Sequence, residues 1–258
     1  MTDVNRLFVL LCGYEVLPKT VSTRDRGARF IVAEPVCAYL LDTRAGWVLL
    51  DTGINPAYCS DPELREREFL RHGWSPPVVR QDHLLEAQMA EIGVTPDQIR
   101  HVILSHLHFD HGDRLDRFSN ARISVQRREH LWAFGEAPGP GYIADDYTMP
   151  GLDWDLRDGD WDAMPGLSLL DTRGHTPGHQ SALVRLPSGK RILLPFDAGD
   201  FAENFIDRVL PGQACDDVAA IAAIDRLNLL CAEPDVEMLL FHDPVAIQTI
   251  RLAPDCYE

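Results

Sequence analysis

Short apolar runs bounded by turn-forming or charged residues recur along the whole chain. Runs of this length are typical of buried strands, because a helix that packs against a core needs a longer repeating pattern. The runs predict strands at Leu7–Leu11, Cys37–Leu41, Trp47–Leu50, His101–Leu104, Ile123–Gln126, Leu167–Leu170, Ser181–Leu186, Ile192–Phe196 and Glu237–Phe241.

Apolar residues three or four positions apart mark a second kind of element. This spacing predicts helices at Leu84–Ile92, Arg127–Phe134 and Asp216–Leu230. In the last of these, Val218, Ile221, Ile224 and Leu227 form a stripe that we expect to face the core. Strands in both halves of the chain, with helices between them, indicate a mixed α and β fold with layered sheets.

Two segments show neither pattern, and we expect long loops there, near Ala57–Val79 and Gly135–Asp162. Loops of this length are uncommon in a compact domain unless they line a site or are disordered. The second segment carries several aromatic residues among carboxylates, which favours a binding lip. Because no repeat or linker interrupts the chain, we expect a single domain over residues 1–258.

Composition and net charge limit the classes of partner that the protein can bind. The 258 residues, 45% of them hydrophobic, suffice for a sizeable core, and the net charge of -16 disfavours nucleic acid and anionic membranes as partners. Six cysteines without a CxxC pair favour reduced thiols over a disulfide framework. No signal peptide is recognisable, and no apolar stretch approaches the ~20 residues of a membrane helix. We therefore expect a soluble cytoplasmic protein, and secretion by another route stays open.

The densest cluster of metal-binding residue types follows the predicted strand at 101–104. The segment from His106 to His111 reads HLHFDH. His106 and His108 are two residues apart and point to one side of an extended chain, whereas Asp110 and His111 follow where the chain turns. Imidazole and carboxylate are preferred ligands of divalent metals, so this segment can serve two neighbouring ions.

Three further segments repeat the arrangement of a predicted strand that ends in a polar ligand. The candidates are His175 and His179 in the segment GHTPGH, Asp197 after the strand at 192–196, and His242 after the strand at 237–241. A rigid strand that delivers a ligand at its end is a common way to fix metal geometry.

Taken together, these motifs resemble the metallo-β-lactamase superfamily. The segments are HLHFDH at 106–111, GHTPGH at 174–179, DAG at 197–199 and HD at 242–243. Within the superfamily, the chain is most similar to the N-acyl homoserine lactonase family, which also matches in the DTG turn at 51–53. The resemblance implies an α+β fold, the four-layer αβ/βα metallo-β-lactamase sandwich, with metal ions in a cleft at one edge.

The resemblance also implies a ligand set by position. One metal ion would be bound by His106, His108 and His175, and the other by Asp110, His111 and His242. Asp197 would bridge the two ions. His179 would lie outside the ligand set, and Asp51 would orient a ligand imidazole by accepting its free N–H.

Two divalent ions, with Zn²⁺ as the first candidate, would share a bridging hydroxide that attacks an ester carbonyl. Asp110 would act as the catalytic residue that carries a proton to the leaving alkoxide. The resemblance thus favours a metal-dependent hydrolase that opens a lactone ring, with N-acyl homoserine lactones and hence quorum quenching as the first candidate. A homodimer is the candidate assembly.

The chain departs from the lactonase family beside the proposed bridge. Those enzymes commonly carry a tyrosine three residues after the bridging aspartate, where this chain has Asp200. Either Asp200 points to solvent, or it recognises a substrate with a hydrogen-bond donor or a positive charge. Tyr142 or Tyr147 would then replace the missing tyrosine as a substrate contact. Phe241 stands where a small glycine is usual and would reshape the floor of the pocket.

Other functions stay open. The same site could hydrolyse a different or aromatic lactone, a thioester or a β-lactam. A metal-binding sensor without catalysis is disfavoured by the complete ligand set, and a nuclease of the same superfamily is disfavoured by the net charge of -16.

Overall fold

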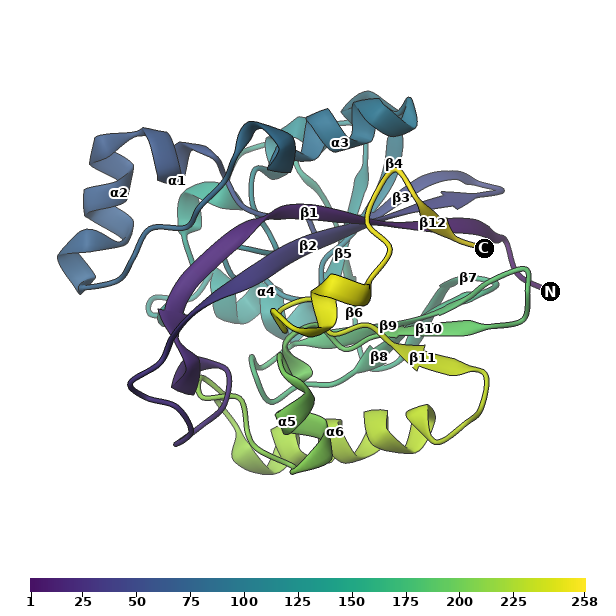
Figure 1. Cartoon of the computed structure of the whole chain (residues 1–258). Helices are drawn as coiled ribbons and strands as arrows, with labels where there is room; N and C mark the ends of the chain where they lie inside the picture. The colour runs from purple at the N-terminus through teal and green to yellow at the C-terminus, as the bar shows by residue number, and fades with distance from the viewer.

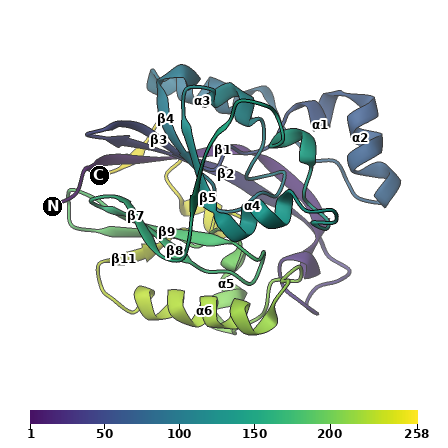
Figure 2. The same ribbon diagram turned by 180° about the vertical axis from the view of Figure 1, so that it is seen from behind.

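Two β-sheets pack face to face at the centre of the molecule, and helices cover their outer faces (Figures 1 and 2). The computed structural model describes residues 1–258. The resulting order of helix, sheet, sheet and helix is the four-layer α+β sandwich that the resemblance implied. No helix in it combines the length and the apolar composition needed to span a bilayer.

The first sheet has seven strands in the order β12-β1-β2-β3-β4-β5-β6. Their bounds are β1 (Val4–Pro18), β2 (Ile31–Thr43), β3 (Gly46–Leu50), β4 (Ile99–Ile103), β5 (Arg122–Gln126), β6 (Asp153–Arg157) and β12 (Cys256–Tyr257). The strands from β12 to β3 pair antiparallel, and those from β3 to β6 pair parallel. Parallel strands end at the same edge of a sheet, so β3 and β4 bring the segments that follow them together.

The second sheet has five strands in the order β11-β10-β9-β8-β7. Their bounds are β7 (Trp161–Met164), β8 (Leu167–Asp171), β9 (Gln180–Arg185), β10 (Arg191–Leu194) and β11 (Val236–Met238). All neighbours pair antiparallel except β10 and β11, which are parallel. Residues of both sheets, among them Val9, Tyr39, Leu169 and Ile192, share one buried apolar cluster between the sheets.

Six helices complete the fold, namely α1 (Ala57–Ser60), α2 (Pro62–Glu68), α3 (Leu85–Ile92), α4 (Arg127–Ala133), α5 (Ala202–Ile206) and α6 (Asp217–Cys231). Figure 1 shows α3 over the first sheet, α5 and α6 under the second, and α1 and α2 at one end of the molecule. Each buried leucine, isoleucine or phenylalanine in these layers contributes roughly 1.5–3 kcal/mol of transfer free energy.

The predicted stripe on α6 is wrong at its first position. Val218 is 82% exposed, whereas Ile224 and Leu227 are buried together with Ala220 and Ala223. A strict spacing of three residues drifts by about 60° per step around a helix of 3.6 residues per turn. Val218 and Leu227 therefore lie on opposite sides of α6, and the small alanines complete the buried face.

The two predicted loops also contain regular structure. The segment 57–79 holds α1 and α2, and Asp61 caps α2 by accepting from the backbone N–H groups of Glu63 (2.8 Å) and Leu64 (3.2 Å). The segment 135–162 holds β6, which pairs parallel with β5 at the edge of the first sheet. Its sequence, DWDLR, carries charged side chains that suit an edge strand and hide the apolar pattern of a buried one.

Candidate metal centre

The first ligand group combines residues that follow β4 and β8. His106 Nε2 lies 2.9 Å from His108 Nδ1, which lies 3.1 Å from His175 Nε2. Asp197 Oδ2 completes the group at 3.3 Å from His175 Nε2. Four buried ligand atoms thus converge on one point, from loops that the two sheets hold in place.

The second ligand group lies on the other side of the same aspartate. His111 Nε2 lies 3.0 Å from Asp110 Oδ2 and 3.1 Å from Asp197 Oδ1. His242 Nε2 lies 3.3 Å from Asp197 Oδ1. Because Asp197 presents one oxygen to each group, it occupies the position of a bridge between two ions. In each group the ligand atoms lie within 4.8 Å of one another.

Hydrogen bonds on the far side of the rings fix how two ligand imidazoles face the site. His111 Nδ1 lies 2.8 Å from Asp51 Oδ2, and His242 Nδ1 donates to the carbonyl oxygen of Pro35 at 2.9 Å. A proton on Nδ1 leaves the lone pair of Nε2 directed into the site, as a metal ligand requires. Asp51 is itself held by Ser105, whose backbone N–H and hydroxyl donate to it at 2.7 and 2.8 Å.

The backbone around the bridging aspartate is also fixed. The N–H of Asp197 donates to His179 Nε2 at 3.1 Å, so His179 positions the bridge from outside the ligand groups. Phe196, directly before the bridge, has a φ of 48°, and Asp51 has a φ of 57°. Left-handed backbone is unfavourable for a residue with a side chain and is often retained at functional sites.

Glu129, in the first turn of α4, holds the ligand loops together and was not predicted from the sequence. Its Oε1 accepts from Leu107 N–H (3.1 Å) and from the Tyr142 hydroxyl (2.7 Å). Its Oε2 accepts from the Thr176 hydroxyl (2.7 Å) and Gly178 N–H (3.1 Å). The buried carboxylate therefore ties the segment 106–111, the segment 174–179 and the aromatic segment to one another. No motif marks such a residue, because its partners are distant in sequence.

The charges of the two groups differ. Burial lowers the pKa of His106 and His175, and it lowers that of His108 to about 3, so the first group presents neutral imidazoles. In the second group burial opposes protonation, but the carboxylates nearby outweigh it and raise the pKa of His242 to about 10. The two carboxylates of the second group therefore favour a positive charge between them, and they also raise the pKa of His111.

The residues present fit two divalent cations. Buried His111 Nε2 and Asp197 Oδ1 lie 3.1 Å apart but form no well-aligned hydrogen bond, although both point into the ligand groups. Unpartnered buried polar atoms are costly, and metal coordination would satisfy them. Five imidazoles and two carboxylates suit zinc, and also manganese, iron or cobalt.

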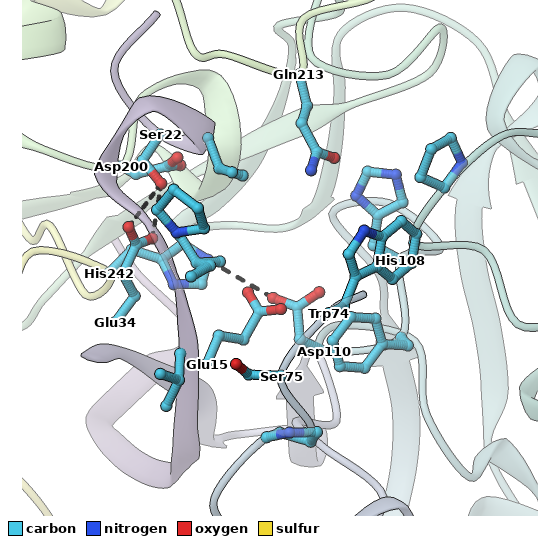
Figure 3. Close-up of a pocket in the computed structure, with 18 of the residues that line it drawn as sticks. Glu15, Ser22, Glu34, Trp74, Ser75, His108, Asp110, Asp200, Gln213 and His242 are labelled. Carbon is cyan, nitrogen blue, oxygen red and sulfur yellow. Dashed lines mark hydrogen bonds and ion pairs between the residues drawn. The ribbon is translucent and has the colours of Figure 1, made fainter. Parts of the chain in front are cut away.

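A cavity of about 350 Å³ opens beside the two groups, and ligands from both of them line it (Figure 3). On the side of His242 its wall carries three more carboxyl groups, those of Glu15, Glu34 and Asp200. Trp74 and Gln213 also border the cavity. Burial raises the pKa of Glu34 to about 7, and burial together with neighbouring carboxylates raises that of Asp200 well above its usual range.

The structure places the four expected substrate contacts differently. Asp200 is only 7% exposed and lines the cavity, so the alternative that it points to solvent is wrong. Tyr147 lies in the core with its hydroxyl bonded to the carbonyl oxygen of Ala133, and Phe241 packs behind the ligands against Tyr39. Neither lines the cavity, because each is held by apolar neighbours. Tyr142 contacts His108 edge to face and borders a second pocket next to the cavity.

Comparisons with known proteins agree with this fold. The family model for the metallo-beta-lactamase superfamily matches residues 32–194. The chain is 32% identical to the N-acyl homoserine lactonase AttM of Azorhizobium caulinodans over the whole of both chains, and 32% identical to the N-acyl homoserine lactonase AiiA of Bacillus thuringiensis subsp. kurstaki over 86% of each.

Solved structures give the same result. The fold superposes with a TM-score of 0.89 on an N-acyl homoserine lactone hydrolase that has the product N-hexanoyl-L-homoserine bound at its catalytic metal centre. That protein is 29% identical, and the match covers 100% of both chains. The chain therefore belongs to the metallo-β-lactamase superfamily, and within it to the family of the N-acyl homoserine lactonases.

Proposed function

We propose that this protein is a dinuclear metal-dependent hydrolase that opens the ring of a lactone, with N-acyl homoserine lactones as the first substrates to test. The observation that carries the proposal is the shared carboxylate of Asp197, which offers one oxygen to each of two converging ligand groups beside a cavity. The lactonase relatives, similar over the whole chain, support the same reaction.

The proposed mechanism assigns a role to each group of residues. Two divalent ions held there would supply a Lewis acid for the carbonyl oxygen and a shared water of lowered pKa. Asp197 fixes the separation of the two ligand groups. Asp110 directs Oδ2 toward His111 Nε2 at 3.0 Å. Its Oδ1 would accept the proton that the attacking water releases and pass it to the leaving ring oxygen.

The first test is metal removal and restoration. Ring opening of N-hexanoyl-L-homoserine lactone should stop after chelation and return when Zn²⁺, Mn²⁺ or Co²⁺ is added back. Unchanged turnover by metal-free protein, or no turnover of any lactone by metal-loaded protein, would contradict the proposal.

Asp110→Asn separates metal binding from proton transfer. The amide oxygen can still act as a ligand, but the side chain can no longer carry a proton. We expect kcat to fall by about 10²–10⁴-fold while the protein keeps its metal. Asp25→Asn, an exposed position outside the cavity, is the matched control. An unchanged kcat in Asp110→Asn would remove Asp110 from the mechanism.

Metal identity, compartment and assembly belong to the same proposal. Zinc is the first candidate because imidazole with carboxylate suits it. The six free cysteines suit the reducing cytoplasm. A homodimer is tested directly by sedimentation of the metal-loaded protein.

A further inference from the structure

Three carboxyl groups outside the ligand groups share one wall of the cavity. Glu15 on β1 and Glu34 on β2 are direct register partners across the antiparallel pair, and both line the cavity. Asp200 joins them from the segment after the bridging aspartate, and Figure 3 shows it next to Ser22, whose hydroxyl faces Glu34. We call these three residues the carboxyl wall. Like charges placed directly opposite on a sheet are destabilising unless something offsets them.

Apart from the imidazoles of the ligand groups, the cavity wall carries no basic side chain that could offset these charges. The Ser22 hydroxyl lies within hydrogen-bond distance of both oxygens of Glu34, at 2.8 and 2.7 Å. Asp200 Oδ1 is buried and has no hydrogen-bond partner, although the residue lines the cavity. No lysine or arginine is among the residues that line the cavity. The carboxyl wall thus offers unused acceptors to whatever enters.

The geometry of the carboxyl wall differs from that of a metal site. The groups of side chains whose ligand atoms converge within 4.8 Å are the two described above, and neither contains Glu15, Glu34 or Asp200. Acceptors spread along a wall suit a larger donor, such as an ammonium group with three N–H bonds pointing in different directions.

We propose that the carboxyl wall binds a cationic nitrogen of the substrate, so that the preferred substrates are lactones that carry an ammonium group. This inference rests on the proposed lactonase function and names the substrate class for the same site. Burial favours the neutral form of Glu34 and Asp200, and a bound ammonium group would favour their ionised form. The resulting charge-assisted hydrogen bond is stronger than a neutral one, so the preference should be large.

Matched substrates test the preference without any mutation. In the first pair, N-(6-aminohexanoyl)-L-homoserine lactone replaces the terminal methyl of N-heptanoyl-L-homoserine lactone with an ammonium group. In the second pair, L-homoserine lactone adds an α-amino group to γ-butyrolactone. We expect kcat/KM of the metal-loaded enzyme to favour the amino compound by at least about tenfold in one pair or both. A smaller ratio in both pairs overturns the inference.

Isosteric variants locate the preference. Glu15→Gln, an isosteric change at a half-buried position, should lower the ratio of the two kcat/KM values at least about tenfold, mainly through KM of the amino compound. Glu34→Gln and Asp200→Asn should act in the same direction. Glu91→Gln, on the exposed face of α3, is the matched control and should leave the ratio unchanged.

Each alternative outcome is distinct. If the ratio of the two kcat/KM values is unchanged in all three variants, the inference is overturned. It is also overturned if a variant lowers kcat/KM equally for both members of a pair, because the carboxyl wall would then only balance the charge of the metal centre. If no lactone is opened, the proposed function fails first. Calorimetric binding of the ring-opened products N-(6-aminohexanoyl)-L-homoserine and N-heptanoyl-L-homoserine then still tests the carboxyl wall, and equal affinities would overturn it.

Discussion

At the scale of single residues, the lone pairs of His111 and His242 are directed by neighbours that lie outside the ligand groups. Asp51 shows this most clearly, because its carboxylate accepts from the Ser105 backbone N–H, the Ser105 hydroxyl and the His111 ring. Three donors around one carboxylate leave His111 a single tautomer, with Nε2 facing Asp110 and Asp197.

Asp51→Asn should therefore weaken metal binding. Asparagine tolerates the left-handed backbone at this position, so the change tests the charge and not the conformation. The amide NH₂ would face either the Ser105 or the His111 donor, and we expect about 10–100-fold lower affinity in the second ligand group. Competition with a coloured chelator measures this. Asp25→Asn, exposed and also left-handed with a φ of 62°, is the control, and equal affinity in both variants would contradict the role of Asp51.

Glu129→Gln should lower the free energy of unfolding. Glutamine keeps the shape but replaces one acceptor oxygen by a donor, which would face either the pair Leu107 and Tyr142 or the pair Thr176 and Gly178. We expect a loss of about 1–3 kcal/mol in urea denaturation, the cost of leaving buried groups unpaired. Exposed Glu136→Gln should change nothing measurable, and an equally stable Glu129→Gln protein would show that the carboxylate is dispensable.

At the scale of elements, the sequence predicted those strands and ligand positions that a short local pattern of apolar and polar residues marks. Strand ends such as His106 and Asp197 were recognisable because an apolar run stops at a ligand-type residue. Edge strand β6 and helix α2 were missed, since charged edge residues and a short capped turn resemble a loop. Glu15 and Glu34 could not be found at all. They face each other only through the register of β1 and β2, and no single segment carries that information.

The segments 57–79 and 135–162, which the sequence predicted as loops, are joined by a buried hydrogen bond that makes the free energy of unfolding depend on pH. The Tyr58 hydroxyl in α1 donates to Asp146 Oδ2 at 2.5 Å, and burial raises the pKa of Asp146 to about 6 from 3.8. Between these values the native state binds more protons than the unfolded state. Stability therefore falls as pH rises toward 6 and is no longer affected by this group above it.

Asp146→Asn tests this directly, because its amide oxygen still accepts from Tyr58 but does not titrate. Relative to the variant, the wild-type protein should lose free energy of unfolding between pH 4 and pH 6. Denaturant titrations across that range measure the difference. A constant difference would contradict the raised pKa, and Asp145→Asn, the exposed neighbour, should follow the wild-type curve.

At the scale of the whole molecule, the ligand groups join the two halves of the sandwich. Asp110 and His111 follow β4 of the first sheet, whereas His175, Asp197 and His242 follow strands of the second. A cation held by both sets must be released when the sheets separate. Metal binding and unfolding are therefore thermodynamically linked.

Metal removal should lower the melting temperature accordingly. At a free metal concentration 100 times the Kd, each site adds about 2.7 kcal/mol to the free energy of unfolding. His242→Ala removes a ligand of the second group only. Calorimetry should therefore show that added Zn²⁺ raises the melting temperature of this variant less than that of the wild type, by the contribution of the first group alone. His72→Ala removes an exposed imidazole outside both groups and should show the full rise. If His242→Ala also showed the full rise in melting temperature, His242 would bind no metal, and the sheets would not be joined through the second group.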